Sequence, residues 1–150
     1  MFEALSAKPH IVRLPLHDVP KVQSLLEAVG LPTIGIKQHY ESNLIARMKD
    51  RVVGMVGLEV YGDHGLIRSL AVEPEQQGSG LGRRLLLNII RLAEQKGLAD
   101  VFIVSTIGAP FFARHGFAQV EVEDVPEAIR GNADFQLLVS DKTVVLRRAI

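Results

Sequence analysis

Apolar and polar residues alternate over several short stretches of this 150-residue chain, and elsewhere the apolar residues follow a helical period. The alternation in His10–His17 predicts a first strand. Asp18 is expected to be the N-cap of the helix that follows, and Gly30 with Pro32 to end it. The apolar residues of that helix recur at three- and four-residue intervals: Val19, Val22, Leu25, Leu26 and Val29.

The middle of the chain predicts an antiparallel meander. Strand-like runs at 43–48, 52–61 and 66–72 are separated by turn residues at 49–51 and 62–65. The preceding stretch, 33–42, has a less regular pattern, and we interpret it as a second short helix that carries His39 and Tyr40.

After residue 77 the apolar residues return to a helical period. One long helix is expected within 78–97, with Gly97 as its stop, and the apolar run 101–106 predicts a strand buried on both faces. A short helix at 109–115, a helix-prone segment at 126–130 and two last strands at 117–122 and 143–148 follow. This order predicts an α/β (α+β) fold, with one mixed, mostly antiparallel sheet flanked by helices, in a single domain over residues 1–150.

Composition excludes several classes of function. Lys plus Arg equal Asp plus Glu at 17 each, so no net charge points to nucleic acid or to an anionic membrane as a partner. The chain has no cysteine, and its histidines are scattered, so we expect no metal site. The opening MFEALSAKPH lacks the pattern of an export signal, and no apolar run is long enough to span a bilayer, so a cytoplasmic protein is expected.

The segment LAVEPEQQGSGLGR, residues 70–83, contains the most informative chemistry. Its glycines open an amphipathic helix, whose first main-chain N–H groups lack helical partners and favour an anion. Ser79 and Arg83 are candidate side-chain donors to a phosphate. The segment lacks the Gly-Lys-Ser/Thr of a Walker loop and the G-x-G-x-x-G of a dinucleotide site. A glycine-rich helix start without any ligand is the alternative interpretation.

The run R-S-L-A-V-x-P-x-x-Q-G-x-G-L-G at Arg68–Gly82 resembles the central motif of the GNAT acetyltransferase superfamily, with Gln77, Gly80 and Gly82 in the characteristic positions. FFARHGF, at 111–117, is similar to a second element of that family. The resemblance covers almost the whole chain. A narrower likeness, in GLEVYGDHGLIRSLAV, APFFARHGF and DVPEAIRGNADFQLL, is to the GNAT subfamily found among arsenic-resistance genes, although Leu138-Val139 stands where those proteins usually have Cys-Pro.

The resemblance implies an acetyl-CoA-dependent N-acetyltransferase that acts on the amine of a small molecule, such as an amino-acid-like toxic compound. It places the pantetheine arm on the main chain of Leu70, Ala71 and Val72, with the Leu70 N–H polarising the thioester carbonyl. Ser105 and Phe112 are further expected cofactor contacts, and Phe112 replaces the tyrosine with which many relatives protonate the departing thiolate. The residues implied to hold the CoA diphosphate are Gln77, Gly78, Ser79, Gly80, Leu81, Gly82 and Arg83.

Three residues of the meander are candidates for binding or deprotonating the acceptor amine. Glu59 is a candidate general base, or else a solvated or salt-bridged strand carboxylate. Arg68 is a candidate clamp for an anionic group of the substrate, or else the partner of Glu59. Tyr61 either lines the acceptor site or fills a half-buried strand position. A non-catalytic acyl-CoA sensor and a protein N-acetyltransferase remain alternative functions, and a homodimer is one assembly that the sequence leaves open.

Overall fold

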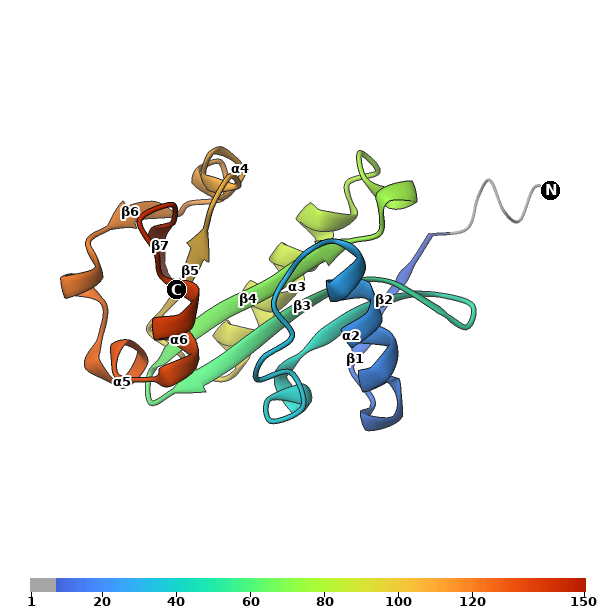
Figure 1. Cartoon of the computed structure of the whole chain (residues 1–150), viewed down its shortest axis with the longest axis horizontal. Helices are drawn as coiled ribbons and strands as arrows, with labels where there is room; N and C mark the ends of the chain where they lie inside the picture. The colour runs from blue at the N-terminus through green and yellow to red at the C-terminus, as the bar shows by residue number, and fades with distance from the viewer. Residues whose placement is uncertain (1–7) are drawn as a thin grey trace. The chain divides into compact units, whose positions relative to one another are not determined.

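The computed structural model describes residues 8–150, so most of the opening segment used for the export-signal expectation lies outside the described range. Its strands form a seven-stranded sheet in the order β1-β2-β3-β4-β5-β7-β6 (Figure 1). The strands are β1 (His10–Arg13), β2 (Leu44–Met48), β3 (Arg51–Tyr61), β4 (His64–Val72), β5 (Asp100–Ser105), β6 (Ala118–Val120) and β7 (Val144–Ala149). The α-helices are α2 (Val19–Ala28), α3 (Leu81–Gln95), α4 (Ala109–Ala113), α5 (Glu127–Arg130) and α6 (Ala133–Leu138).

The sheet is mixed, which confirms the predicted fold class. β1 with β2, β2 with β3, β5 with β7, and β6 with β7 are antiparallel, whereas β4 and β5 are parallel. The described residues divide into two compact units, 8–57 with 69–89 and 58–68 with 90–150. Within residues 8–150, no helix combines the length and the apolar character that crossing a bilayer requires.

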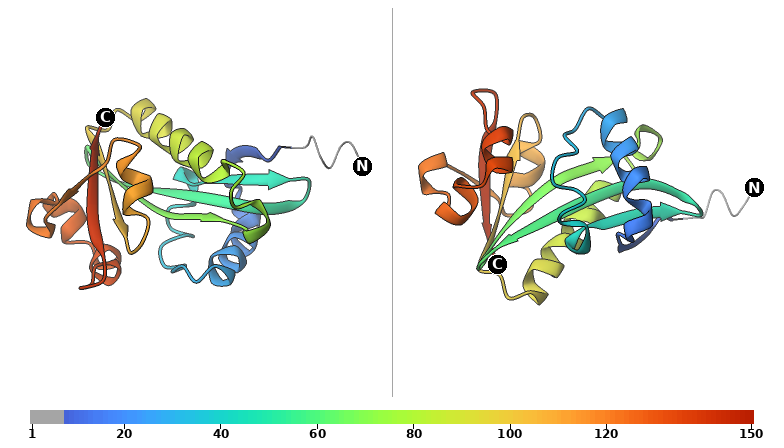
Figure 2. Two further views of the ribbon diagram at one scale, coloured as in Figure 1. Left: turned by 90° about the horizontal axis from the view of Figure 1, so that it is seen from above. Right: turned by 60° about the horizontal axis from the view of Figure 1, so that its bottom comes forward.

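The first unit has a core of aliphatic side chains between α2 and its strands. Val22 and Leu26 of α2 are fully buried, together with Ile45 of β2 and Met55 of β3. The start of α3 lies on the opposite side of these strands from α2 (Figure 2). Gly54 permits this close packing, because a Cβ there would lie 3.0 Å from Leu85 Cδ1 and 3.2 Å from the Ala71 carbonyl oxygen.

The second unit packs its short helices on a separate apolar cluster. Phe135 of α6 and Ile129 of α5 lie in this cluster and are essentially inaccessible to solvent. The strands contribute Leu66 from β4, Phe102 from β5 and Val145 from β7. The C-terminal helices are therefore anchored to the strands by buried side chains at positions where the sequence is apolar.

Several predicted boundaries differ from the observed ones. The strand expected at His10–His17 ends at Arg13, since Pro15 precedes a 3-10 turn, η1 (Leu16–Asp18). The helix expected at 33–42 is wrong: these residues form turns and one 3-10 turn, η2 (Tyr40–Ser42). Two more 3-10 turns, η3 (Pro74–Gln76) and η4 (Val122–Asp124), and helix α6 were not predicted.

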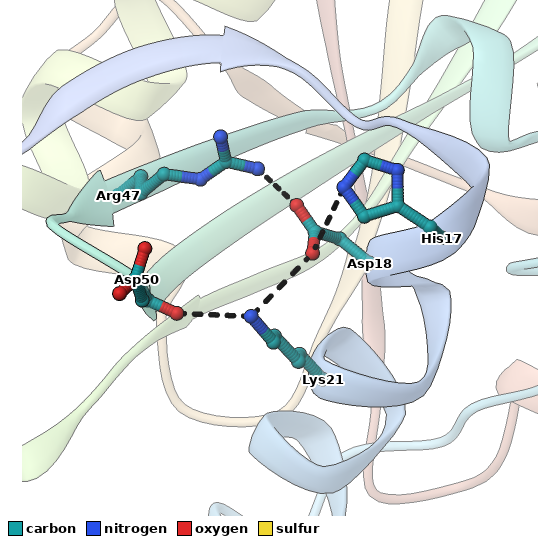
Figure 3. Close-up of polar contacts among 5 residues, drawn as sticks. All are labelled: His17, Asp18, Lys21, Arg47 and Asp50. Carbon is teal, nitrogen blue, oxygen red and sulfur yellow. Dashed lines mark hydrogen bonds and ion pairs between the residues drawn. The ribbon is translucent and has the colours of Figure 1, made fainter.

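Asp18 stands at the N-cap position of α2, as predicted, but its side chain does not cap the helix. The carboxylate instead pairs with Arg47 of β2, and it lies 3.7 Å from Lys21 Nζ and 3.6 Å from His17 Nε2 (Figure 3). Lys21 also donates to the main-chain oxygen of Asp50 at 3.0 Å. Because Asp18 is only 2% exposed, its charge requires the nearby cations Arg47 and Lys21, and the cluster ties the start of α2 to β2 and its turn.

Removing Arg47 is expected to destabilise the protein, because it leaves the buried Asp18 carboxylate without its closest cation. We expect Arg47→Leu to lower the free energy of unfolding by about 2 kcal/mol, which urea denaturation would measure. The control is Arg51→Leu, whose side chain is 59% exposed and pairs with Glu73, and whose loss should cost less than about 1 kcal/mol. Equal losses for the two variants would contradict the role given to the Asp18 cluster.

Candidate active site

The glycine loop between β4 and α3 has a main-chain conformation that requires glycine. Gly78 has a φ of 82° and Gly80 a φ of 86°, both in the left-handed region. A Cβ at either position would meet no atom within 4 Å. Backbone conformation, rather than lack of space, therefore explains these two glycines, and the surface of the loop is open.

The loop leaves a row of main-chain donors without acceptors. Gln77 N–H and Ser79 N–H bond to the carbonyl oxygens of Pro74 and Gln76, at 3.3 Å each. Within residues 8–150, no acceptor satisfies the N–H groups at Gly78 and at 80–83. Such a row at the start of a helix of fifteen residues, Leu81–Gln95, can bind an anion through several hydrogen bonds at once.

Two side chains of the loop stabilise its conformation, and a third side chain is available to bind a ligand. Gln77 Nε2 donates to the Val72 carbonyl oxygen at 3.1 Å, and the Ser79 hydroxyl donates to the Gln76 carbonyl oxygen. Both side chains thus hold the loop in its conformation. Arg83 is exposed and has no ion pair within the described part of the chain, so its guanidinium is available to an anion on the loop.

The strand before the loop is irregular at Ser69. Its φ of 62° is unusual for a residue that is not glycine, and strain of this kind concentrates at functional sites. The parallel pairing of β4 with β5 runs from His64 to Ile67, so Ser69 lies beyond it. A left-handed residue interrupts the regular alternation of main-chain N–H directions, which changes how the N–H of Leu70 is presented.

In the second unit, the three predicted acceptor-side residues form one hydrogen-bonded group. Arg68 Nη1 donates to Glu59 Oε2 at 3.1 Å, and the Tyr61 hydroxyl donates to Glu59 Oε1 at 2.6 Å. Glu59 is 1% exposed and Arg68 5%. The sequence left the Glu59–Arg68 pair as one of two alternatives, and this pair is what the structure contains. Burial, followed by the bond to the Glu59 carboxylate, raises the pKa of Tyr61 well above its usual range.

The second unit contains two of the predicted cofactor contacts, Ser105 and Phe112, and both make contacts with residues close to them in the sequence. Ser105 Oγ accepts a hydrogen bond from the Gly108 N–H at 2.9 Å, which shapes the turn from β5 into α4. Phe112 is buried, with its ring centroid 5.2 Å from that of Phe111 and 5.7 Å from that of Phe117. The Phe112 ring therefore stabilises the packing of α4, whatever further contact it makes.

Asp134 is a candidate that the sequence analysis missed. One of its carboxylate oxygens lies within 4.8 Å of a Glu59 carboxylate oxygen, and its charge contributes to the raised pKa of Tyr61 after burial and the Glu59 interactions. The only local signal was Asn132, which caps α6 by accepting from the Asp134 N–H at 2.9 Å. Nothing in the sequence pattern joins residue 134 to residue 59.

Comparison with known proteins identifies the family. The family description "Acetyltransferase (GNAT) domain" matches residues 39–119. The amino-acid acetyltransferase of Mycobacterium tuberculosis is 30% identical over 129 residues, which are 76% of this chain and 71% of that protein. The amino-acid acetyltransferase of Neisseria meningitidis is 29% identical over 140 residues, 87% of this chain but 32% of the relative.

A solved structure agrees with these relatives. The N-acetylglutamate synthase of Neisseria gonorrhoeae, in complex with coenzyme A and N-acetyl-glutamate, superimposes with a TM-score of 0.81 at 27% identity. The match covers 96% of this chain and 35% of that one, so the chain spans about a third of the length of these Neisseria relatives.

The chain belongs to the GNAT acetyltransferase family. This result confirms the family resemblance found in the glycine loop, the acetyltransferase class and acetyl-CoA as the cosubstrate. Two of the relatives reported above are named amino-acid acetyltransferases and the third is named N-acetylglutamate synthase, and none of these names refers to arsenic.

Proposed function

We propose that this protein transfers the acetyl group of acetyl-CoA directly to the α-amino group of an amino acid. The observation that carries the proposal is the row of main-chain N–H groups without acceptors at Gly78 and 80–83, in a chain whose relatives are amino-acid acetyltransferases. Because a diphosphate has several anionic oxygens, such a row can bind it through many hydrogen bonds without a metal ion.

In this proposal the glycine loop and the strand before it provide most of the contacts to the cosubstrate. Residues Gln77–Arg83 hold the CoA diphosphate, with the exposed guanidinium of Arg83 as the added charge. The main chain of Leu70, Ala71 and Val72 pairs with the pantetheine arm as with an added strand. The Leu70 N–H, which follows the left-handed Ser69, donates to the thioester carbonyl oxygen and stabilises the negative charge that develops there. Ser105 and Phe112 are further proposed contacts of the pantetheine.

The reaction forms a bond between the amine nitrogen and the acetyl carbon, and breaks the bond between that carbon and sulfur. The CoA thiolate leaves, and one proton leaves the nitrogen. Phe112 cannot protonate the thiolate, but a thiol pKa of about 8.5 makes the thiolate a tolerable leaving group near neutral pH. An α-amino group with a pKa of about 8 is roughly a tenth neutral at pH 7, so deprotonation requires only a weak base.

Glu59 is the proposed acceptor of the amine proton, through water. Its two oxygens are held by Tyr61 and Arg68, so the carboxylate has a fixed position. Arg68, as the buried partner of Glu59, serves mainly to orient that carboxylate rather than to clamp the substrate. Tyr61, half-buried, completes this group on the acceptor side.

An amino acid is favoured as the acceptor because the relatives named above act, by their names, on amino acids. The narrower likeness to the arsenic-resistance subfamily makes an amino-acid-like toxic compound the second candidate, since such a compound presents the same α-amino group. Protein N-termini and an acyl-CoA sensor without turnover are the remaining alternatives, and the same assay distinguishes them.

Release of free thiol from acetyl-CoA tests this proposal directly. The protein is incubated with acetyl-CoA and, separately, with a panel of amino acids, arsenic- or phosphorus-containing amino-acid analogues, and short peptides. We expect thiol release above background with at least one amino acid, and mass spectrometry should find that amino acid N-acetylated. Acetylation of the peptides alone would support a protein N-acetyltransferase. Binding of CoA without thiol release from any acceptor would support the sensor.

Gly80→Asp is expected to abolish CoA binding, because it places a side chain and a negative charge beside the diphosphate. The control is Gly97→Asp, at the other end of α3. Both glycines have a φ in the left-handed region, and a Cβ at either would meet no atom within 4 Å, so the two variants impose similar strain. Calorimetry should find CoA affinity lost in the first variant and kept in the second. Equal affinities would rule out the glycine loop as the diphosphate site.

Glu59→Gln is expected to slow acetyl transfer more at neutral pH than at high pH. Without the carboxylate, the reaction depends on amine that is already neutral, and this fraction rises as the pH passes the amine pKa of about 8. The ratio of wild-type to variant kcat should therefore fall from pH 6.5 to pH 9.5, from a starting value of about 100. A ratio that does not change with pH would remove Glu59 as the base and leave it as the structural partner of Arg68.

A further inference from the structure

The 3-10 turn η3, which leads into the glycine loop, is bound to the start of strand β3. The Glu73 N–H, just before the turn, donates to the Val53 carbonyl oxygen at 2.8 Å. Arg51, the first residue of β3, pairs through Nη2 with Glu73 Oε1 and lies 3.5 Å from Glu75 Oε2. One guanidinium thus joins two carboxylates of the segment that precedes the loop.

The hairpin of β2 and β3 that carries Arg51 is itself held in place. Arg51 is paired with Met48 across the turn between the two strands. Met48 also contacts the η3 turn, since its Sδ accepts from Gln76 Nε2 at 3.2 Å. On the other side, Lys21 of α2 donates to the Asp50 carbonyl oxygen at 3.0 Å. The Arg51 side chain therefore extends from a main chain that is fixed by its neighbours.

The η3 turn in turn determines the position of the glycine loop. The Gln76 carbonyl oxygen accepts from the Ser79 N–H at 3.3 Å and from the Ser79 hydroxyl. A shift of η3 would therefore move the row of N–H groups at Gly78 and 80–83. An anion that takes several hydrogen bonds at once tolerates a displacement of only about 0.5 Å in its donors.

Charge attraction alone does not explain the residues before the loop. Glu73 and Glu75 are negative, so on charge alone they weaken the attraction of the loop for a diphosphate. Burial, followed by the hydrogen bond with Glu75, raises the pKa of Glu73, and the charge of Arg51 opposes this rise. What these carboxylates provide is a contact with Arg51 that fixes the turn.

We propose that Arg51 is a positioning residue of the cosubstrate site: through Glu73 it holds the η3 turn so that the glycine loop presents its N–H groups to the CoA diphosphate. This inference rests on the proposed function and deepens it. The guanidinium acts through Glu73 and Glu75, which engage it, and not by contact with the cosubstrate.

The test compares Arg51→Leu with the wild type in binding and in kinetics. Calorimetry with CoA should find the affinity about tenfold lower, because one charge-assisted contact that orders the loop is lost. The KM for acetyl-CoA should rise by the same factor, while kcat and the KM for the acceptor are unchanged. A merely structural role would lower kcat through loss of folded protein and leave the KM for acetyl-CoA as it is. Arg51→Lys keeps a cation and should recover part of the affinity.

Glu73→Leu separates positioning from charge, because the two explanations predict opposite signs. Loss of the contact with Arg51 should weaken CoA binding, whereas loss of a negative charge alone would strengthen it. Since both substitutions remove the same contact, the double variant Arg51→Leu/Glu73→Leu should lose no more affinity than Arg51→Leu does. Tighter binding by Glu73→Leu, additive losses in the double variant, or unchanged CoA affinity in Arg51→Leu would overturn the inference.

A second ion pair of the chain provides matched controls. Arg130 and Glu127 of α5 lie 3.9 Å apart, with side chains 41% and 91% exposed. Arg130→Leu and Glu127→Leu make the same two changes of charge outside the loop and its turn, and both should leave the affinity for CoA unchanged. A loss of affinity in Arg130→Leu equal to that in Arg51→Leu would assign the effect to net charge and contradict the inference.

The same measurements keep the inference distinct from the proposed function. If the wild type binds CoA but acetylates no amino acid, the proposed function fails, and calorimetry still decides the role of Arg51. If the wild type acetylates an amino acid and Arg51→Leu does so with the same KM for acetyl-CoA, only the inference fails. If the wild type does not bind CoA, both are wrong.

Discussion

The passage of the main chain from β4 into α3 is the constraint on which the proposed cofactor site depends. Between Ser69 and Leu81 the backbone takes left-handed conformations at Ser69, Gly78 and Gly80, and it turns within a few residues from an extended strand to a helix. A chain that turns in this way cannot satisfy all of its own N–H groups. The result is a row of donors that must be met by water or by an anion, and the open surface of the loop admits either one.

The two clusters of buried charge differ in the groups that surround the central carboxylate. Around Asp18, one buried carboxylate is met by two cations, Arg47 and Lys21, and the cluster joins α2 to β2. Around Glu59, one arginine compensates the carboxylate, and the Tyr61 hydroxyl donates to its other oxygen. This group therefore holds the Glu59 carboxylate in one orientation, which a residue that accepts a proton needs.

Sequence reasoning was most successful where a local pattern determines the structure. The helical period of α2 and α3 and the apolar runs of β3, β4 and β5 gave elements whose ends lie within a few residues of those observed. It failed at Asp18, where a residue typical of an N-cap is bound by Arg47, 29 positions away. It failed again at 33–42 and at α6, since these segments depend on packing rather than on a strong period of their own.

The glycine loop could be assigned a function because all of its parts are contiguous in the sequence. The acceptor group could not, since Glu59, Arg68 and Asp134 belong to different elements, and only the fold decides which charges face one another. Glu59 and Arg68 were placed within one meander, so their pairing was an available alternative. Asp134 lies after a stretch of turns and short helices that no periodicity connects to β3. Its closeness to Glu59 therefore follows from the anchoring of Phe135 in the apolar cluster, a tertiary contact that no local pattern contains.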